Sequence, residues 1–423
     1  MRAVLHPCTL SGRVQAPPSK SVAHRALICA ALAKGESVLD GILPSEDIAA
    51  TLRGLEALGA SVRMEGTAAH ITGCGGRINP AAGPMDCGES GSTLRFLLPI
   101  FALSASPARL TGRGRLPLRP LYPYAEIFHT QGLPFAQDDT GVSFQGPLRP
   151  GLFELPGDVS SQFLSGLLFA LPLLGDDSEI RIRPPFESSS YVELTLDALA
   201  AFGVRAAFVD DRILRVPGNQ CYRPHPSYQV EGDASQAAFF KLAGAVLGDV
   251  SVEGLRPDSK QGDRVMADIL TRCGVATARI AGVYMPLKSS LQATVIDLAD
   301  CPDLGPALMV LGCFCQGETV IHNAGRLRLK ESDRIAAMEQ ELTKLGGRLH
   351  SEGDTVFIQG SPLHEGPALS AHGDHRIAMA LAIACLCAGL EAAIEGAEAV
   401  NKSYPGFWQE VQSLGGRVEL LPL

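Results

Sequence analysis

The chain has 423 residues, of which 46% are apolar and 19% charged, and its formal net charge is −9. This composition is typical of a folded globular protein and excludes a disordered, collagen-like or highly charged helical chain. The acidic balance disfavours a nucleic-acid-binding surface, although it allows a local site for small anions. At about 150 residues per domain, the length predicts two or three domains.

The sequence gives no indication of export or membrane insertion. Residues 1–14 lack the apolar stretch of a signal peptide, and the longest apolar stretches, 163–174 and 377–390, are shorter than the roughly 20 residues of a membrane span. The eleven cysteines form no Cys-x-x-Cys pair, so we expect buried reduced thiols rather than disulfides or a metal site. We therefore expect a soluble, cytoplasmic protein.

An amphipathic helix that ends at a glycine and continues into a strand recurs along the chain. The glycines that share this position are Gly59, Gly132, Gly203, Gly274, Gly346 and Gly415. Their spacings are 73, 71, 71, 72 and 69 residues. A glycine directly after a helix commonly adopts the left-handed conformation that ends it, so each one predicts a helix-to-strand junction. A constant period of this length predicts a repeat architecture.

A strongly apolar helix followed by a short strand precedes each of these amphipathic helices. The apolar segments are 21–35, 91–103, 160–175, 234–248, 303–317 and 375–389. Because they are apolar on nearly all faces, we expect them to be buried. Each unit is thus predicted to contain an apolar helix, a strand, an amphipathic helix, a strand and a hairpin return strand, and six such units fill the chain.

The sixth unit is incomplete, because the few residues after Gly416 supply no return strand. The segment Ala3–Leu10 is a strand that no unit uses, and we expect it to complete the sixth unit. This predicts an α/β protein of two domains with three repeats each, residues 18–229 and residues 1–17 with 230–423. The chain then crosses twice between the domains, which would permit closure around a ligand.

Basic residues stand at the start of several helices, where the helix dipole favours acidic residues instead. Lys20 and Arg25 open the first apolar helix, Arg95 opens the second and Arg376 opens the sixth. Arg334 opens an amphipathic helix. Because equivalent helices of a repeat point their N-termini in similar directions, these cations and helix ends together predict an anion site.

Hydroxyl and carboxylate groups accompany these cations. The hydroxyls at helix starts are candidate N-caps that would also donate to a phosphate, namely Ser21, Ser92, Thr93, Ser160 and Ser161. Asp303 opens the fifth apolar helix, and Glu331 lies between Lys330 and Arg334. A cap for Asp303 and a structural ion pair for Glu331 are the alternatives. Cations that bind anions, with carboxylates that move protons, predict transfer chemistry on phosphorylated acids.

Nine motifs make this sequence resemble a known family. They are PPSKSVAHR, GESGSTLR, GDVSSQF, VEGDAS, QGD, CPD, RLKESDR, GDHRIAMA and NKSYPG. They occur in the order found in the 5-enolpyruvylshikimate-3-phosphate synthases, an enolpyruvyl transferase family, and extend over about residues 18–408. The resemblance implies a two-domain inside-out α/β barrel, with three βαβαββ repeats per domain around buried parallel helices.

The reaction implied by the resemblance belongs to the shikimate pathway to chorismate and aromatic amino acids. The enolpyruvyl group of phosphoenolpyruvate moves to the 5-hydroxyl of 3-phosphoshikimate, and phosphate leaves through addition and elimination. No metal or organic cofactor is implied, because phosphoenolpyruvate itself carries the activated group. The implied partners are these two small molecules, and we expect a monomer that binds neither nucleic acid nor membrane.

The resemblance also implies which residues bind the substrates. For 3-phosphoshikimate they are Lys20, Ser21, Arg25, Ser160, Ser161, Gln162, Ser188, Tyr191, Asp303 and Lys330. For phosphoenolpyruvate they are Lys20, Gly91, Ser92, Arg119, Gln162, Arg334, Arg376 and Lys402. Cations from both domains would offset the repulsion between two multiply charged anions.

Three residues are implied in proton transfer, namely Asp303, Glu331 and Lys20. Asp303 would accept the proton of the 5-hydroxyl. Glu331 would protonate the methylene carbon of phosphoenolpyruvate, with Lys20 or Lys402 as alternative proton donors.

Two positions depart from the pattern of the family. Glu89 stands where many members carry asparagine, and a carboxylate beside an anion site must turn away or pair with a cation. Arg326 stands where some members have an asparagine that contacts shikimate. In this family the herbicide glyphosate competes with phosphoenolpyruvate. Because a Cβ at Gly91 would project toward that substrate, we expect this glycine to leave the enzyme sensitive.

Three other functions remain open at this point. The UDP-N-acetylglucosamine enolpyruvyl transferases share the fold, but they typically carry a lysine-asparagine pair and a loop cysteine. Here the pair is Lys20-Ser21, and the sequence has no cysteine between Cys87 and Cys221. An RNA-end-processing or RNA-binding protein of related repeats would need a basic, aromatic face. A non-catalytic anion-binding protein of the same fold would lack Asp303 or Glu331, and both are present.

Overall fold

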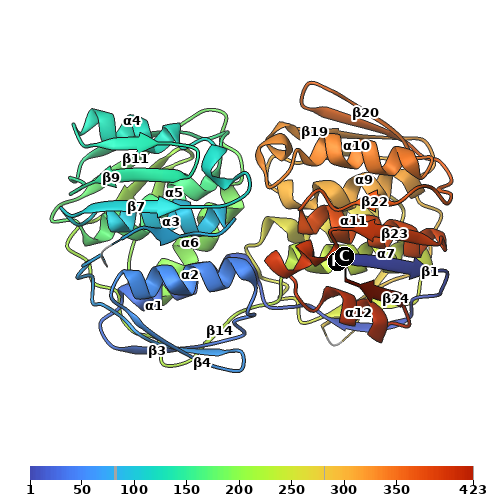
Figure 1. The fold of residues 1–423 in the computed structure, drawn as a ribbon, viewed down its shortest axis with the longest axis horizontal. Helices are drawn as coiled ribbons and strands as arrows, with labels where there is room; N and C mark the ends of the chain where they lie inside the picture. Colours follow the sequence, from blue (N-terminus) through green and yellow to red (C-terminus); the bar gives the residue numbers. More distant parts are fainter. Residues whose placement is uncertain (81–82, 281, 423) are drawn as a thin grey trace. The chain divides into compact units, whose positions relative to one another are not determined.

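The computed structural model describes residues 1–80, 83–280 and 282–422. The chain divides into two compact units, which are both drawn in Figure 1. The first, here called the N-unit, is Pro18–Val230. The second, here called the C-unit, is Met1–Pro17 together with Glu231–Leu423.

Strongly apolar helices form the centre of each unit, as the sequence predicts. They are α1 (Lys20–Leu32), α3 (Gly91–Phe101) and α5 (Ser161–Ala170) in the N-unit, and α7 (Ala234–Leu247), α9 (Gly305–Phe314) and α11 (His375–Ala388) in the C-unit. On α11 every residue from His375 to Leu386 is buried. Because these helices have no polar face, they are stable only when other elements surround them. Among the described residues, each helix is too short or too polar to span a bilayer.

The amphipathic helices alternate with the apolar ones along the chain. They are α2 (Glu46–Ala57), α4 (Tyr122–Thr130), α6 (Ser189–Ala201), α8 (Met266–Arg272), α10 (Arg334–Lys344) and α12 (Phe407–Ser413). The six glycines predicted to end them all have positive φ, between 66° and 100°. This confirms the predicted helix ends, because the left-handed conformation is open to glycine at little cost. Short 3₁₀ helices are η1 (Leu116–Leu118), η2 (Leu171–Leu173), η3 (Gly262–Val265), η4 (Pro302–Leu304), η5 (Gly325–Leu329) and η6 (Ala397–Lys402).

The described strands form four-stranded sheets that share one order. In each, the strand that follows an apolar helix pairs parallel with a short strand on one side and antiparallel with a return strand on the other. The N-unit sheets are β14 (Tyr228–Gln229)–β3 (Glu36–Asp40)–β5 (Ala68–Thr72)–β4 (Ser61–Glu65), β6 (Met85–Asp86)–β7 (Pro107–Thr111)–β9 (Gly141–Gln145)–β8 (Phe135–Gln137), and β10 (Leu152–Pro156)–β11 (Ser178–Arg183)–β13 (Ile213–Val216)–β12 (Ala207–Asp210).

The C-unit repeats this arrangement. Its sheets are β2 (Gly12–Gln15)–β15 (Val250–Glu253)–β17 (Val283–Pro286)–β16 (Thr277–Ile280), β18 (Val295–Asp297)–β19 (Glu318–His322)–β21 (Thr355–Gln359)–β20 (Arg348–Glu352), and β22 (Leu369–Ser370)–β23 (Ala392–Glu395)–β1 (Arg2–His6)–β24 (Arg417–Leu421). The α/β class predicted from the sequence is thereby confirmed.

The N-terminal strand β1 lies inside a sheet, between β23 and β24. Leu5 stands opposite Ala392 on one side and Val418 on the other. The prediction that this strand completes the sixth unit is confirmed. Its expected extent, Ala3–Leu10, is too long, because β1 ends at His6 before Pro7, which has no backbone N–H for the ladder.

At the two chain crossings, the short strand before an apolar helix pairs with a strand of the other repeat involved in the crossing. This exchange was not predicted from the sequence. Elsewhere the short strand before an apolar helix pairs with the strand after that same helix, as β6 and β7 do around α3. By contrast, β2 precedes α1 but pairs with β15, which follows α7. Likewise β14 precedes α7 but pairs with β3, which follows α1. Each crossing therefore starts from a strand that is fixed in a sheet of the unit it leaves.

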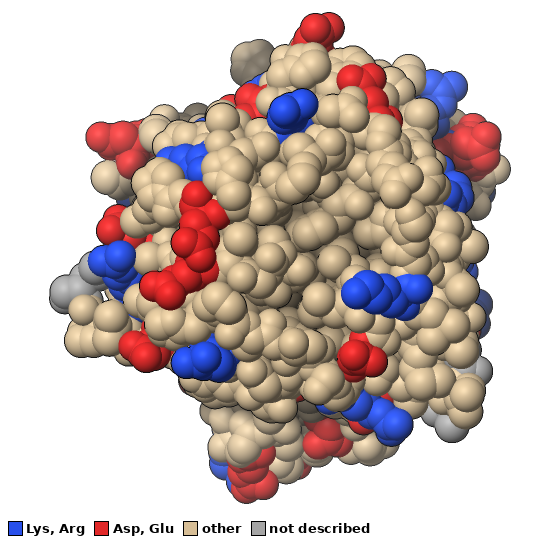
Figure 2. All heavy atoms as spheres, turned by 90° about the vertical axis from the view of Figure 1, so that its right-hand side faces the viewer, with Lys and Arg blue, Asp and Glu red and all other residues tan. Residues whose placement is uncertain are grey.

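Figure 2 shows one face of the C-unit in space-filling form. On this face the acidic and basic side chains are scattered around an area of uncharged residues, and the described residues there form no continuous basic patch. This is the surface expected for a chain with a net charge of −9, and it offers no electrostatic track for a nucleic acid on that face.

The fully buried Leu5 on β1 provides a test of how strongly this strand supports the C-unit. We expect Leu5→Ala to lower the free energy of unfolding by about 3 kcal/mol, because the truncated side chain leaves a cavity. Trp408 is the only tryptophan of the chain and is buried in the C-unit, so its fluorescence follows urea unfolding of that unit. Leu421→Ala on β24, where the side chain is 44% exposed, is the control and should keep the wild-type midpoint. Equal midpoints for the two variants would contradict a central role for β1.

Candidate active site

Lys20, the first residue of α1, is held by a carboxylate at the start of α2. Its Nζ donates to Oδ2 of Asp47 at 2.6 Å, and both side chains are mostly buried. The sequence analysis did not single out Asp47, whose only signal is its place among the acidic residues of a first helical turn. The pair fixes the lysine ammonium beside the N-terminal end of α1, where it adds to the partial charge of the helix.

Arg25 is buried in the N-unit and ties three helices together. Its Nε donates to Thr195 Oγ1 at 2.8 Å, and its two terminal nitrogens donate to the carbonyls of Ser21 and Tyr191 and to the hydroxyl of Ser165. Burial lowers the pKa of Arg25 to about 10. Because four donor contacts are used within the protein, Arg25 joins α1 to α5 and α6 and retains little capacity for a ligand.

The N-caps lie earlier than the sequence analysis expects in two helices. Ser160 does cap α5, accepting from the Gln162 amide at 3.3 Å. The caps of α1 and α3, however, are Ser19 and Ser90. The expectation that Ser21, Ser92, Thr93 and Ser161 act as caps is therefore wrong, because each lies within the first turn rather than before it.

Gln162 connects the starts of α3 and α5. Its Oε1 accepts from Arg95 Nη1 at 2.7 Å, and its Nε2 donates to Ser92 Oγ at 2.9 Å. The Arg95 guanidinium also lies over the ring of Phe163. This chain orients the Ser92 hydroxyl and fixes the spacing of two helix N-termini, which is the geometry an anion site requires.

Gly91 begins α3 directly against the guanidinium of Arg119. A Cβ at position 91 would lie 2.8 Å from Arg119 Nη1 and 3.2 Å from Cζ, so the absent side chain is what lets the guanidinium approach. In the sequence analysis the glycine was expected to give space to a ligand. In this structure it gives that space to Arg119.

Ser188 and Glu89 are two further N-unit residues that were singled out from the sequence. Ser188 precedes α6 in the left-handed conformation, with φ 58°, and is buried. The Glu89 carboxylate lies against the turn at Gly114, where a Cβ would come within 2.8 Å of Oε2. Glu89 is thus directed at the turn of Arg113 and Arg115 rather than left to occupy the start of α3.

Arg334, the first residue of α10, pairs with three carboxylates of the C-unit. Its side chain is 1% exposed and donates to Asp374 at 2.8 Å and to Glu331 at 2.7 Å, with a longer contact of 3.3 Å to Asp303. Burial alone would lower the pKa of Arg334, but the three carboxylates together raise it above its usual value. For Asp374 the directions are reversed. Burial alone would raise its pKa, but the attraction of Arg334 lowers it.

Asp303 in η4 accepts from three cations. Its Oδ2 receives Arg376 Nη2 at 2.8 Å, and its Oδ1 receives Lys330 Nζ and Arg334 Nη1, each at 3.3 Å. Arg376 Nη1 also donates to the backbone carbonyl of Asp303 at 3.1 Å. The alternative that Asp303 caps α9 is wrong, because Leu304 occupies that position and no side chain caps the helix.

Two lysines of the C-unit, Lys330 and Lys402, lie near Asp303 and Asp374, on different elements. Lys330 follows η5, and burial lowers its pKa against the attraction of Asp303. Lys402 at the end of η6 donates to the Gly373 carbonyl at 2.6 Å, in the loop before α11. Arg326 lies in η5 and donates to the Ala299 carbonyl. Within the described residues, no cluster of histidine, cysteine or acidic side chains has the arrangement of a metal site.

Asp374 is a residue of the site that was not predicted from the sequence, although it lies in the motif GDHRIAMA. Asp374 is fully buried, caps α11 through the Arg376 amide, and accepts from Ser332 and Arg334. The one available signal was an acidic residue directly before an apolar helix. The side chains of this region, here called the C-unit cluster, are Asp303, Lys330, Glu331, Arg334, Asp374 and Arg376. Its cations can bind multiply charged anions, and its carboxylates can exchange protons with them.

Comparisons with known proteins agree on one family. The family model of EPSP synthase (3-phosphoshikimate 1-carboxyvinyltransferase) matches residues 5–411. A relative from Clostridium perfringens (strain 13 / Type A), named 3-phosphoshikimate 1-carboxyvinyltransferase, is 43% identical over 98% of both chains. One of the same name from Clostridioides difficile (strain 630) is 40% identical, again over 98% of both chains.

A solved EPSP synthase from Acinetobacter baumannii has the same fold, with a TM-score of 0.81, 26% identity and coverage of 99% of each chain. The two-domain inside-out α/β fold is thereby confirmed, and the UDP-N-acetylglucosamine transferase alternative is not favoured. The chain therefore belongs to the EPSP synthase family and is a 3-phosphoshikimate 1-carboxyvinyltransferase, an enzyme of the shikimate pathway that transfers the enolpyruvyl group of phosphoenolpyruvate to 3-phosphoshikimate.

Proposed function

We propose that the candidate site residues of the N-unit and the C-unit perform this reaction. In this proposal Asp303 is the general base. The observation that carries the proposal is the group of three cations around the Asp303 carboxylate. A carboxylate that accepts from three cations is a poor proton acceptor. When anionic substrates attract Lys330 and Arg376, Asp303 becomes a better proton acceptor as the 5-hydroxyl arrives.

The residues assigned to 3-phosphoshikimate lie mainly in the N-unit. They are Lys20, Ser21, Arg25, Ser160, Ser161, Gln162, Ser188 and Tyr191, with Asp303 and Lys330 from the C-unit. The hydroxyls of Ser21 and Ser161, which cap no helix, suit a phosphate better than a helix end. Because Arg25 donates four times within the protein, its main role is to hold α1, α5 and α6 around the phosphate.

The residues assigned to phosphoenolpyruvate are Lys20, Gly91, Ser92, Arg119 and Gln162 of the N-unit and Arg334, Arg376 and Lys402 of the C-unit. Arg376 and Lys402 are assigned as the direct ligands of the C-unit, where Arg376 also donates to Asp303 and Lys402 to the Gly373 carbonyl. Arg334 is fully engaged by carboxylates and acts chiefly by keeping Glu331 and Asp303 in place.

The reaction proceeds by addition and then elimination. The 5-hydroxyl oxygen bonds to C2 of phosphoenolpyruvate while its proton passes to Asp303, and the methylene carbon takes a proton from Glu331. Lys20 or Lys402 are the alternative donors. The C2–O bond to phosphate then breaks in the tetrahedral intermediate, and the new methyl group returns a proton to the group that donated it, which restores the double bond. Arg376 and Lys402 stabilise the departing phosphate.

We also propose that the enzyme is a cytoplasmic monomer whose two units are the domains expected from the repeats. All eleven cysteines are free thiols, and most are buried, which suits a reducing compartment.

Asp303→Asn tests the base assignment, because it keeps the shape of the side chain and removes its proton affinity. We expect turnover to fall by roughly 10²–10⁴. Phosphate release measured with both substrates gives turnover, and calorimetric titration gives the affinity for 3-phosphoshikimate, which should change much less. Asp297→Asn on β18 is the control, since Asp297 accepts from Asn323 and the Ala299 amide outside the cluster. Turnover within a few-fold of wild type would remove Asp303 from this role.

Gly91→Ala tests the phosphoenolpyruvate side of the N-unit. The new methyl group would displace Arg119 and narrow the space at the start of α3, so the Michaelis constant for phosphoenolpyruvate should rise. Glyphosate is the longer molecule, so its inhibition constant should rise by a larger factor. Gly175→Ala is the control, because a Cβ there meets no atom within 4 Å. Equal fold-changes in the two constants would show that position 91 does not discriminate between the two ligands.

A further inference from the structure

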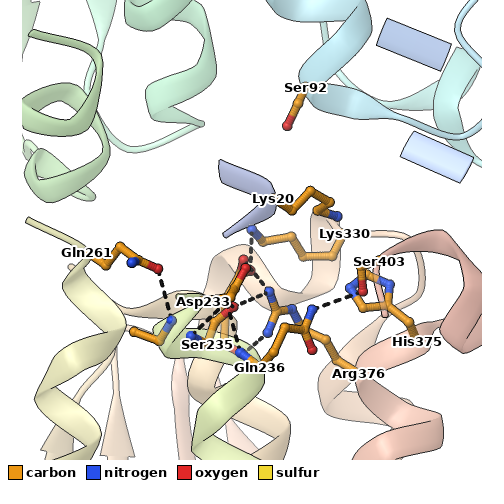
Figure 3. Close-up of polar contacts among 12 residues, drawn as sticks. Lys20, Ser92, Asp233, Ser235, Gln236, Gln261, Lys330, His375, Arg376 and Ser403 are labelled. Carbon is orange, nitrogen blue, oxygen red and sulfur yellow. Dashed lines mark hydrogen bonds and ion pairs between the residues drawn. The ribbon is translucent and has the colours of Figure 1, made fainter. Parts of the chain in front are cut away.

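The first turn of α7 lies beside Arg376, although no role was assigned to its motif VEGDAS. Asp233 caps this helix: its Oδ1 accepts from the amides of Ser235 and Gln236, both at 2.9 Å. The same oxygen accepts the Ser235 hydroxyl at 2.7 Å. These three contacts are drawn together with Arg376 in Figure 3.

Ser235 connects this cap to the arginine. Its hydroxyl donates its one proton to Asp233 and accepts from Arg376 Nη2 at 3.0 Å, which uses both functions of the group. The side chain is 6% exposed, so water does not compete freely for either contact. Because the acceptor is a carboxylate oxygen of Asp233, it polarises the hydroxyl and makes the hydroxyl oxygen a better partner for a cation.

The α7 turn itself is firmly held. The buried Gln261 carboxamide accepts from the Ala234 amide at 2.9 Å and donates to the Gly232 carbonyl at 2.7 Å. The Asp233 amide donates to the Pro17 carbonyl at 2.7 Å. Ser235 therefore projects from a backbone fixed on both sides, which is what a group that orients another side chain needs.

The carboxylate partner of Arg376, Asp303, changes its charge during the reaction. In the mechanism proposed above, Asp303 takes up a proton and thereby loses the charge that attracts the guanidinium. Ser235 keeps the same charge and the same hydrogen bonds throughout. Together with the Asp303 backbone carbonyl, which accepts from Nη1 at 3.1 Å, Ser235 can therefore keep Arg376 aligned while phosphate departs.

We propose that Ser235 is a positioning residue for Arg376 and that it sets the affinity for phosphoenolpyruvate through this arginine. The inference rests on the proposed role of Arg376. A second contact supports the same turn as a platform for this substrate: Gln236 Nε2 donates to Ser403 Oγ at 3.0 Å, directly after Lys402 (Figure 3).

Ser235→Ala tests the proposal. The cap of α7 survives this change, because Asp233 keeps both backbone donors, so the variant should fold. We expect the Michaelis constant for phosphoenolpyruvate to rise about tenfold, while the constant for 3-phosphoshikimate and the melting temperature stay near wild type. Ser251→Ala, which removes an outlying serine contact to the Gly12 carbonyl, is the matched control and should change neither constant. Equal rises in the two constants, or an unchanged constant for phosphoenolpyruvate, would overturn the proposal.

A double-mutant cycle with Arg376→Lys separates positioning from a general structural effect. Lysine lacks the Nη2 group that donates to the Ser235 hydroxyl. In the Arg376→Lys background, Ser235→Ala should therefore raise the Michaelis constant for phosphoenolpyruvate by less than about twofold. The same tenfold rise in both backgrounds would show that Ser235 acts independently of Arg376. If Arg376→Lys itself leaves the phosphoenolpyruvate constant unchanged, the proposed role of Arg376 fails and the inference fails with it. If only the Ser235→Ala effect is missing, the inference alone fails.

Discussion

The C-unit depends on one buried cation, the guanidinium of Arg334. It joins carboxylates from three places in the chain: Asp303 in η4, Glu331 after η5 and Asp374 at the start of α11. Taking such charges out of water is costly, and only a complete set of partners offsets that cost. Losing any member would leave a buried charge with an incomplete set of partners. The same network holds the Asp303 carboxylate beside Arg376 of α11.

In the N-unit, a chain of uncharged side chains connects neighbouring helices. His24 Nδ1 contacts the Thr51 hydroxyl at 2.8 Å, Thr51 contacts Thr93 at 2.7 Å, and Thr93 donates to Ser90, the cap of α3. Burial, reinforced by the nearby cations, lowers the pKa of His24 well below its usual value, so the ring stays neutral. A hydroxyl chain of this kind fixes α1, α2 and α3 relative to one another without adding charge.

Local physics explains what the sequence could predict. The left-handed glycines such as Gly59 and the all-apolar α11 are readable from a few neighbouring residues, and β1 was predictable because the last repeat lacked a strand. The two-residue strand β14 has no period to detect, and its partner is set by a distant sheet. Asp47 and Asp374 were missed for a similar reason, since a carboxylate's partner lies elsewhere in the chain. The proposed roles of Asp303 as base and Glu331 as acid came from the family resemblance, whereas the local pattern of acids among cations predicted only transfer chemistry on phosphorylated acids.

The central position of β1 has a consequence for how the protein is made. Leu5 is synthesised before the N-unit but pairs with Ala392, so its partner emerges only after the whole N-unit has been synthesised. Contacts of such long sequence separation close slowly, and an unpaired strand edge invites association with other chains until they do. The N-unit can thus acquire its structure during translation, whereas the C-unit must wait. The brevity of β1, which ends before Pro7, limits the exposed edge during that interval.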